Sequence, residues 1–307
     1  MKAQKFSIKL WLIELRAPFF TASCVPVILG AMMAWHETRS FDLFYLILTL
    51  IGVLALHAAT NTLNDYFDYQ SGNDLLNREA NRPFDGGSPF LVDGRLDAKA
   101  VYRFGFSALL LGIGIGLFLA FRKGWWIIPM GLIGVGTAYF YVEPGVRLAS
   151  RGLGELLTGL CFGPLVVVGT YYVQAQEISS GALMAGIPVG FLITNVLFIN
   201  QFPDQEADRA VGKNHWVVRL GKKKAAKVFV LLVSAVYASV ALGVLMGILP
   251  KISLITFGTI PLSLKGVLVT LREYDHSPKL RPVQALTILT HLSTGLLLSL
   301  SFYLSEL

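Results

Sequence analysis

A run of amide and carboxylate side chains follows an apolar segment that ends near residue 61. Its members are one, three or four residues apart, so a continuing helix would place them on one face. They are His57, Asn61, Asn64, Asp65 and Asp68. The face begins inside an apolar segment, where polar groups are costly and usually functional. Gly72 permits a turn that would bring Asp74 back toward the same place.

A second run of this kind lies in the second half of the chain. Asn200, Asp204 and Asp208 are each four residues apart and therefore share one helical face. Both runs contain the pattern Asn-x-x-x-Asp, and each stands at the end of an apolar segment. Because four apolar segments separate the runs, we interpret them as an internal duplication whose two sites face each other.

The side chains in these runs suit one kind of ligand. Carboxylates this dense repel one another unless a cation compensates their charge. Oxygen ligands from Asp and Asn, without clusters of His or Cys, favour Mg²⁺, which commonly bridges one or two carboxylates to phosphate oxygens. A single run of this kind is more often a solvated helix end, because short acidic patterns are common. Two matched runs predict a diphosphate held between metal ions, with basic side chains on its remaining oxygens.

The elements that must position these runs are apolar. The chain has 307 residues, of which 54% are hydrophobic and 15% charged, and its mean hydropathy is +0.61. This composition excludes a disordered chain, a coiled coil and a collagen-like repeat. We predict an all-α integral membrane protein with a single domain, residues 1–307, and nine transmembrane helices, each able to cross about 30 Å of hydrocarbon. The nine segments are approximately 19–35, 43–61, 104–121, 125–141, 153–173, 182–200, 228–249, 252–271 and 283–303.

The basic residues are distributed unevenly over the connections. Of the 26 lysines and arginines, 21 fall on the side that holds the N-terminus, four on the other side, and Lys265 within a span. The positive-inside rule therefore predicts a cytoplasmic N-terminus. Two long cytoplasmic loops, at about 65–101 and 201–227, hold 10 of the 19 acidic residues, so we expect the active-site motifs there. The net charge of +7 then reflects topology, and nucleic-acid binding is not needed to explain it.

At these motifs the chain resembles a known family. Asn64-Asp65-Tyr66-Phe67-Asp68 with Asp74, and Asp204-Gln-Glu-Ala-Asp208-Arg209, look like the two aspartate-rich motifs of the UbiA superfamily of intramembrane prenyltransferases. The resemblance covers nearly the whole chain in order. It extends through Arg16-Ala-Pro18, Arg82 to Ser88, Arg151 to Glu155 and Gly212 to Gly221. The spacing from Asp68 to Asp74 and the Gly-Gly-Ser segment look most like the dihydroxynaphthoate prenyltransferase branch of the menaquinone pathway.

The resemblance implies helices around a central cavity and a Mg²⁺-dependent transfer of a polyprenyl group from its diphosphate to an aromatic acceptor. The expected acceptor is 1,4-dihydroxy-2-naphthoate, with diphosphate and CO₂ as products. Carried over by motif, the expected metal ligands are Asn64, Asp68, Asp74, Asn200, Asp204 and Asp208. The expected diphosphate or substrate contacts are Arg16, Asn61, Arg82, Tyr139, Arg147, Arg151, Arg209 and Lys213. Asp65, Asp68 and Asp204 are the expected catalytic residues, Asp65 either as a proton acceptor or as support for the metal site.

Two departures from the family pattern bear on the acceptor. Val142-Glu143-Pro144-Gly145 stands where relatives often carry Pro-Pro, and Asn-His-Trp follows Lys213 in place of an Arg/Thr-rich run. A hydroxybenzoate, a homogentisate, haem, a glycerol lipid or a sugar phosphate is therefore the alternative acceptor. A cation-coupled transporter is the alternative from another class, and it would place ionisable groups near mid-membrane. We expect membrane lipid as a partner, no obligate protein partner, and the cell's inner membrane as the location.

His57 and His291 each stand alone in an apolar segment, and we interpret both as hydrogen-bonded packing residues and not as ligands. Aromatic side chains near the ends of the spans are expected to act as interfacial anchors, or to stabilise an allylic cation through their faces. They are Tyr66, Phe67, Tyr139, Phe140 and Tyr141.

Overall fold

The protein is a bundle of long helices. The computed structural model describes residues 8–76, 84 and 87–305, and these contain helices but no strand. Each of the nine predicted apolar segments corresponds to a helix or to consecutive helical pieces. Eight of them are long and apolar enough to cross a membrane, and the ninth, α7 (Ile127–Phe140), is a shorter apolar helix.

The helices that form the bundle are α2 (Thr21–Thr38), α3 (Leu43–Ser71), α6 (Ala98–Lys123), α7 (Ile127–Phe140), α8 (Gly154–Leu160) with η3 (Cys161–Leu165) and α9 (Val166–Ala175), α10 (Ser180–Ala210), α12 (Lys222–Leu245), η4 (Lys251–Thr259) with α13 (Ile260–Glu273), and α14 (Ser277–Leu304).

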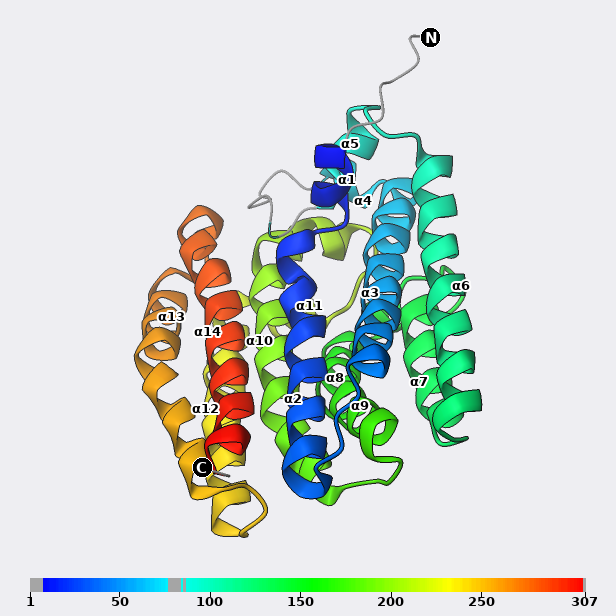
Figure 1. Ribbon diagram of the computed structural model, residues 1–307. Coiled ribbons are helices and arrows are strands. Elements are labelled where there is room, and N and C mark those ends of the chain that lie inside the picture. Colours follow the sequence, from blue (N-terminus) through cyan, green and yellow to red (C-terminus); the bar gives the residue numbers. More distant parts are fainter. Residues whose placement is uncertain (1–7, 77–83, 85–86, 306–307) are drawn as a thin grey trace.

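In Figure 1, α13 and α14 lie at one side of the bundle and α6 and α7 at the other, with α2 and α10 between them. Helix α3 packs against α6, α2 against α9 and α14, and α10 against α12 and α14. Short helices, several of them at the end of the bundle where α3 stops (Figure 1), complete the fold. They are α1 (Ile8–Glu14), η1 (Ala17–Phe20), α4 (Asn73–Leu76), α5 (Pro89–Val92), η2 (Leu148–Arg151) and α11 (Trp216–Leu220).

The two acidic runs lie on helices that continue past their apolar segments. Helix α3 extends through Asp65 and Asp68 and ends at Ser71, and the next residue, Gly72, has a φ of 75° that turns the chain into α4 and Asp74. Helix α10 likewise continues to Ala210. The first residues of both stretches expected as loops are therefore helical, and the rigid helix ends position the carboxylates.

Helix α10 makes an unusually close backbone contact with η3. A Cβ atom built on Gly163 would lie 2.5 Å from the Cα and N atoms of Gly190, so only glycine fits there. Glycines allow such approach between helices in a membrane. The segment η3 is a π-helical turn that contains Pro164, and a π-bulge of this kind redirects side chains, often at functional sites. Here the consecutive residues Cys161 and Phe162 both face the interior cavity.

Candidate active site

A cavity of about 380 Å³ lies inside the bundle. Both Asp68 and Thr49 line it, and their separation of 19 residues on α3 corresponds to about 28 Å at the helical rise per residue. One end is polar. The remaining length is mainly apolar, with walls from α3, α6, α7 and α9 that include Gly52, Leu119 and Met130.

The polar end brings the two acidic runs together, as predicted. All six expected metal ligands line the cavity: Asn64, Asp68, Asp74, Asn200, Asp204 and Asp208. Lys213 lies between the two runs, with its Nζ 2.6 Å from the Asp68 carboxylate and 3.7 Å from Asp208 Oδ1. Although burial opposes the charge on this ammonium, the two aspartates outweigh the effect and raise the pKa of Lys213, which keeps it cationic.

The N-terminal segment contributes a second cation to this end. The guanidinium of Arg16 contacts Asp65 at 2.5 Å, and Arg16 has a left-handed backbone with φ 52°. Next to it, the Asn61 amide donates to the Leu15 carbonyl at 3.2 Å. Arg16 and Asn61 line the cavity, whereas Asp65 is buried behind Arg16 and does not. Asp65 therefore contacts the polar end through Arg16.

The donor set at this end suits Mg²⁺. Two buried oxygens from opposite runs, Asp74 Oδ2 and Asn200 Oδ1, have no hydrogen-bond partner within the part of the chain that the structure describes. Burial, together with the charges of Asp68 and Asp65, raises the pKa of Asp74 to about 9, so its anionic form needs a nearby cation. Within the described ranges no three Asp, Glu, His or Cys side chains form a complete metal group.

Four of the expected substrate contacts do not line the cavity: Tyr139, Arg147, Arg151 and Arg209. Tyr139 packs against the apolar cluster between α3, α6 and α7. The Arg209 guanidinium donates to the Val218 carbonyl at 3.3 Å. Arg82, a further expected contact, lies outside the described residues.

Two residues of the polar end were missed by the sequence reasoning. His215 is buried and lines the cavity, with its Nε2 2.9 Å from Asp208 Oδ2. Its Nδ1 accepts the Val218 amide, so Nε2 carries the proton and donates to Asp208. Asn73 donates to the other oxygen of Asp208 at 2.8 Å. The only signal for His215 was its place in the unusual Asn-His-Trp segment.

The two isolated histidines differ in their surroundings. His57 Nδ1 lies 2.9 Å from the Ser23 hydroxyl, and its ring makes edge contacts with Phe20 and Phe162, so the predicted hydrogen bond is present; the ring also lines the cavity. His291 is also buried, but among the described residues neither of its ring nitrogens has a hydrogen-bond partner. The predicted hydrogen bond is therefore wrong for His291 within this part of the chain.

Sequence comparison agrees with this geometry. The UbiA prenyltransferase family matches residues 23–291. The 2-carboxy-1,4-naphthoquinone phytyltransferase of Synechocystis is 29% identical over 96% of this chain and 93% of its own length. The 1,4-dihydroxy-2-naphthoate octaprenyltransferase of Bacillus subtilis is 28% identical over 72% of this chain and 70% of its own.

Solved structures share the fold at lower identity. The apo structure of a UbiA homolog from Aeropyrum pernix has a TM-score of 0.67 and 17% identity, covering 95% of this chain and 99% of the homolog. A homolog from Archaeoglobus fulgidus bound to DMAPP and Mg²⁺ has a TM-score of 0.62 and 17% identity, covering 92% of this chain and 98% of the homolog. The predicted all-helical membrane fold is confirmed.

Proposed function

Because the chain belongs to the UbiA prenyltransferase family and is an integral membrane prenyltransferase, we propose that it transfers a polyprenyl group from its diphosphate to 1,4-dihydroxy-2-naphthoate. One observation carries this proposal. Two Asn/Asp runs, with Arg16 and Lys213 beside them, line one end of a cavity whose remaining length is mainly apolar. A diphosphate with an isoprenoid tail has the same division between a charged head and a long apolar chain.

The residues have distinct roles in this reaction. Asn64, Asp68, Asp74, Asn200, Asp204 and Asp208 would hold Mg²⁺. The metal, when bound, neutralises the charge that develops on the diphosphate. Arg16 and Lys213 bind the remaining anionic oxygens. The apolar walls hold the isoprenoid chain and keep water away from the allylic carbon, which protects it from hydrolysis.

The bond changes balance without a further reactant. The allylic C–O bond breaks and its electron pair leaves with the diphosphate. The electron-rich ring carbon that bears the carboxylate forms the new C–C bond. The C–CO₂ bond then breaks, CO₂ leaves, and its electron pair restores the aromatic ring. Preorganised charges around the diphosphate supply the main stabilisation of this path.

The naphthoate acceptor is supported by two relatives, the 2-carboxy-1,4-naphthoquinone phytyltransferase of Synechocystis and the 1,4-dihydroxy-2-naphthoate octaprenyltransferase of Bacillus subtilis. A hydroxybenzoate, a homogentisate or another family acceptor is the alternative within the same chemistry. A cation-coupled transporter fits less well, because the carboxylates lie at one end of the cavity beside basic groups and not at mid-depth. The uneven distribution of basic residues supports a site that faces the cytoplasm, in the inner membrane.

The test is an acceptor panel. Purified protein with Mg²⁺ and one labelled polyprenyl diphosphate receives dihydroxynaphthoate, hydroxybenzoate and homogentisate in parallel. We expect a prenylated product and diphosphate from dihydroxynaphthoate, with labelled CO₂ when the carboxyl carbon carries the label. Prenylation of another acceptor in preference to dihydroxynaphthoate would overturn the naphthoate assignment.

A further inference from the structure

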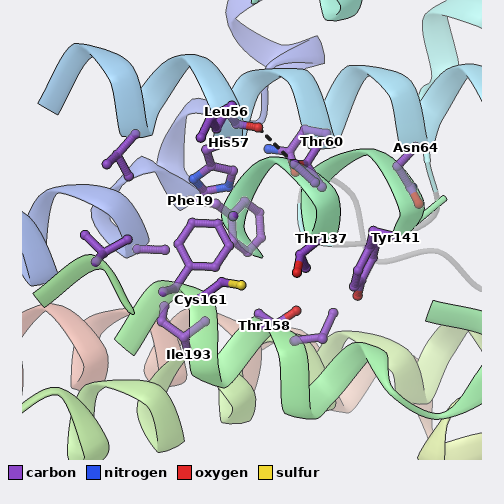
Figure 2. A pocket seen from close by; sticks show the side chains of 18 of the residues that line it. Phe19, Leu56, His57, Thr60, Asn64, Thr137, Tyr141, Thr158, Cys161 and Ile193 are labelled. Atoms are coloured by element: carbon purple, nitrogen blue, oxygen red, sulfur yellow. Dashed lines mark hydrogen bonds between the residues drawn. The ribbon is translucent and has the colours of Figure 1, made fainter. Parts of the chain in front are cut away.

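Uncharged hydroxyl groups line the middle of the cavity. Thr60 comes from α3, Thr137 and Tyr141 come from α7 and the residue that ends it, and Thr158 comes from α8; all four line the cavity. Figure 2 shows Thr60 and Thr158 on opposite sides of one space, with Thr137 and Tyr141 next to each other between them. We call them the hydroxyl belt. Thr137 and Tyr141 are four residues apart, so they share one face of the helix.

The hydroxyl belt lies between the polar end and the apolar length. On α3, Thr60 is eight residues from Asp68, which corresponds to about 12 Å, and 11 residues from Thr49, about 17 Å. A group bound at the belt is therefore beside the first carbons of an isoprenoid chain whose diphosphate is held at Asp68. The isoprenoid tail would continue past the belt toward Thr49.

The belt hydroxyls are free to accept further hydrogen bonds. Thr60 donates to the Leu56 carbonyl at 2.9 Å, Tyr141 interacts with Thr158, and Thr137 with the Cys161 thiol. A hydroxyl has one donor and two acceptor positions, so each retains acceptor capacity toward the cavity. No charged side chain belongs to the belt. It therefore suits neutral O–H groups, whereas a phosphate suits the polar end.

Aromatic side chains accompany the belt. Phe19 and Phe162 line the same part of the cavity, and the Phe162 ring also meets His57 at a centroid distance of 4.8 Å. Figure 2 shows Phe19, His57 and Cys161 on the side of the belt away from Asn64. Ring edges and faces of this kind pack well against a flat aromatic ligand.

We propose that the hydroxyl belt is the acceptor subsite, where Thr137, Tyr141 and Thr158 accept hydrogen bonds from the phenolic O–H groups of a dihydroxy-aromatic ring. The inference rests on the proposed function and adds to it the place and orientation of the acceptor. A site built to bind a ligand hydroxyl discriminates strongly against an analogue that lacks it, because its polar groups are then left unpaired. The belt therefore selects acceptors by their hydroxyl groups.

The experiment removes hydroxyls without changing shape. Thr137→Val, Thr158→Val and their double variant are compared with wild type for the KM of dihydroxynaphthoate and the KM of the polyprenyl diphosphate. Thr62→Val is the control for the loss of a threonine hydroxyl outside the cavity. Thr62 is a buried threonine of α3 whose hydroxyl donates to the Ala58 carbonyl at 2.7 Å, and it does not line the cavity. We expect each belt variant to raise the acceptor KM about threefold to tenfold, with the diphosphate KM unchanged.

A second measurement separates recognition from packing. An acceptor with one phenolic hydroxyl methylated should be a poor substrate for wild type and for Thr62→Val. For the double belt variant, the KM values for the methylated and the unmethylated acceptor should lie closer together. Equal acceptor KM values in belt and control variants, with the preference for the free hydroxyl retained, would overturn the subsite. If wild type prenylated no aromatic acceptor at all, the proposed function would fail first, and the subsite with it.

Discussion

The side-chain amide of Asn73 donates a hydrogen bond to Asp208 Oδ1 across 2.8 Å. This bond joins α4, which follows the first acidic run, directly to the second run on α10. Because Asn73 is neutral, it holds the two acidic runs together without adding charge. His215 donates to the other oxygen of Asp208, so the carboxylate is oriented from two sides.

Removing this amide should loosen the polar end. We expect Asn73→Ala to raise the Mg²⁺ concentration needed for half-maximal activity about tenfold, as losses around metal ligands commonly do. Asn73→Asp should be worse, because it places a second carboxylate against Asp208. The Mg²⁺ dependence of activity measures both. If Asn73→Ala required no more Mg²⁺ than wild type, the orienting role would be refuted.

Asp68→Asn and Asp204→Asn should each abolish turnover, because each removes a charge that the metal and diphosphate site requires. The measurement is product formation from labelled polyprenyl diphosphate, with thermal unfolding in detergent to show that both variants remain folded. Activity that survives in both, or that persists after a chelator removes divalent metal, would contradict the metal–diphosphate assignment.

Gly87 should tolerate no side chain. A Cβ atom there would lie 1.9 Å from Asp74 Oδ1, and the φ of 67° is strained for any other residue. Gly94 has a similar φ of 65° but open space around it, so Gly94→Ala measures strain alone. We expect Gly87→Ala to lose at least tenfold more activity than Gly94→Ala, because it displaces Asp74. Equal losses in an activity assay would mean that the contact with Asp74 is unimportant.

Glu14 should make stability depend on pH. It is buried beside Ser88, and burial raises the pKa of this carboxyl from 4.5 to about 8. The folded state therefore holds the Glu14 proton more tightly than the unfolded state does. The stability that this proton contributes is complete below pH 4.5 and is lost as pH rises toward 8. Relative to Glu14→Gln, wild type should therefore lose up to about 1.4 kcal/mol per pH unit in this range. Thermal unfolding of wild type and Glu14→Gln at pH 5 to 9 tests this. If the unfolding temperatures of the two proteins changed with pH in the same way, Glu14 would not be the source of the pH dependence.

Much of the architecture follows from the sequence by itself. Apolar segments of the right length must be helical in lipid, since no water is present to satisfy their backbone groups. Spacing of three and four residues then places Asn64 with Asp68, and Asn200 with Asp204 and Asp208, on shared faces. Helical periodicity is a local property, so both acidic runs could be predicted before their surroundings were known.

Only the tertiary structure decided which groups these faces meet. Arg16 contacts Asp65, Asn73 contacts Asp208, and Lys213 contacts Asp68. Each of these contacts joins residues that are far apart in the chain. Tyr139 and Tyr141 illustrate the same limit. They are two residues apart with similar local sequence, yet only Tyr141 faces the cavity. The rotation of a helix about its axis is set by packing against its neighbours, and helical spacing carries no information about that rotation.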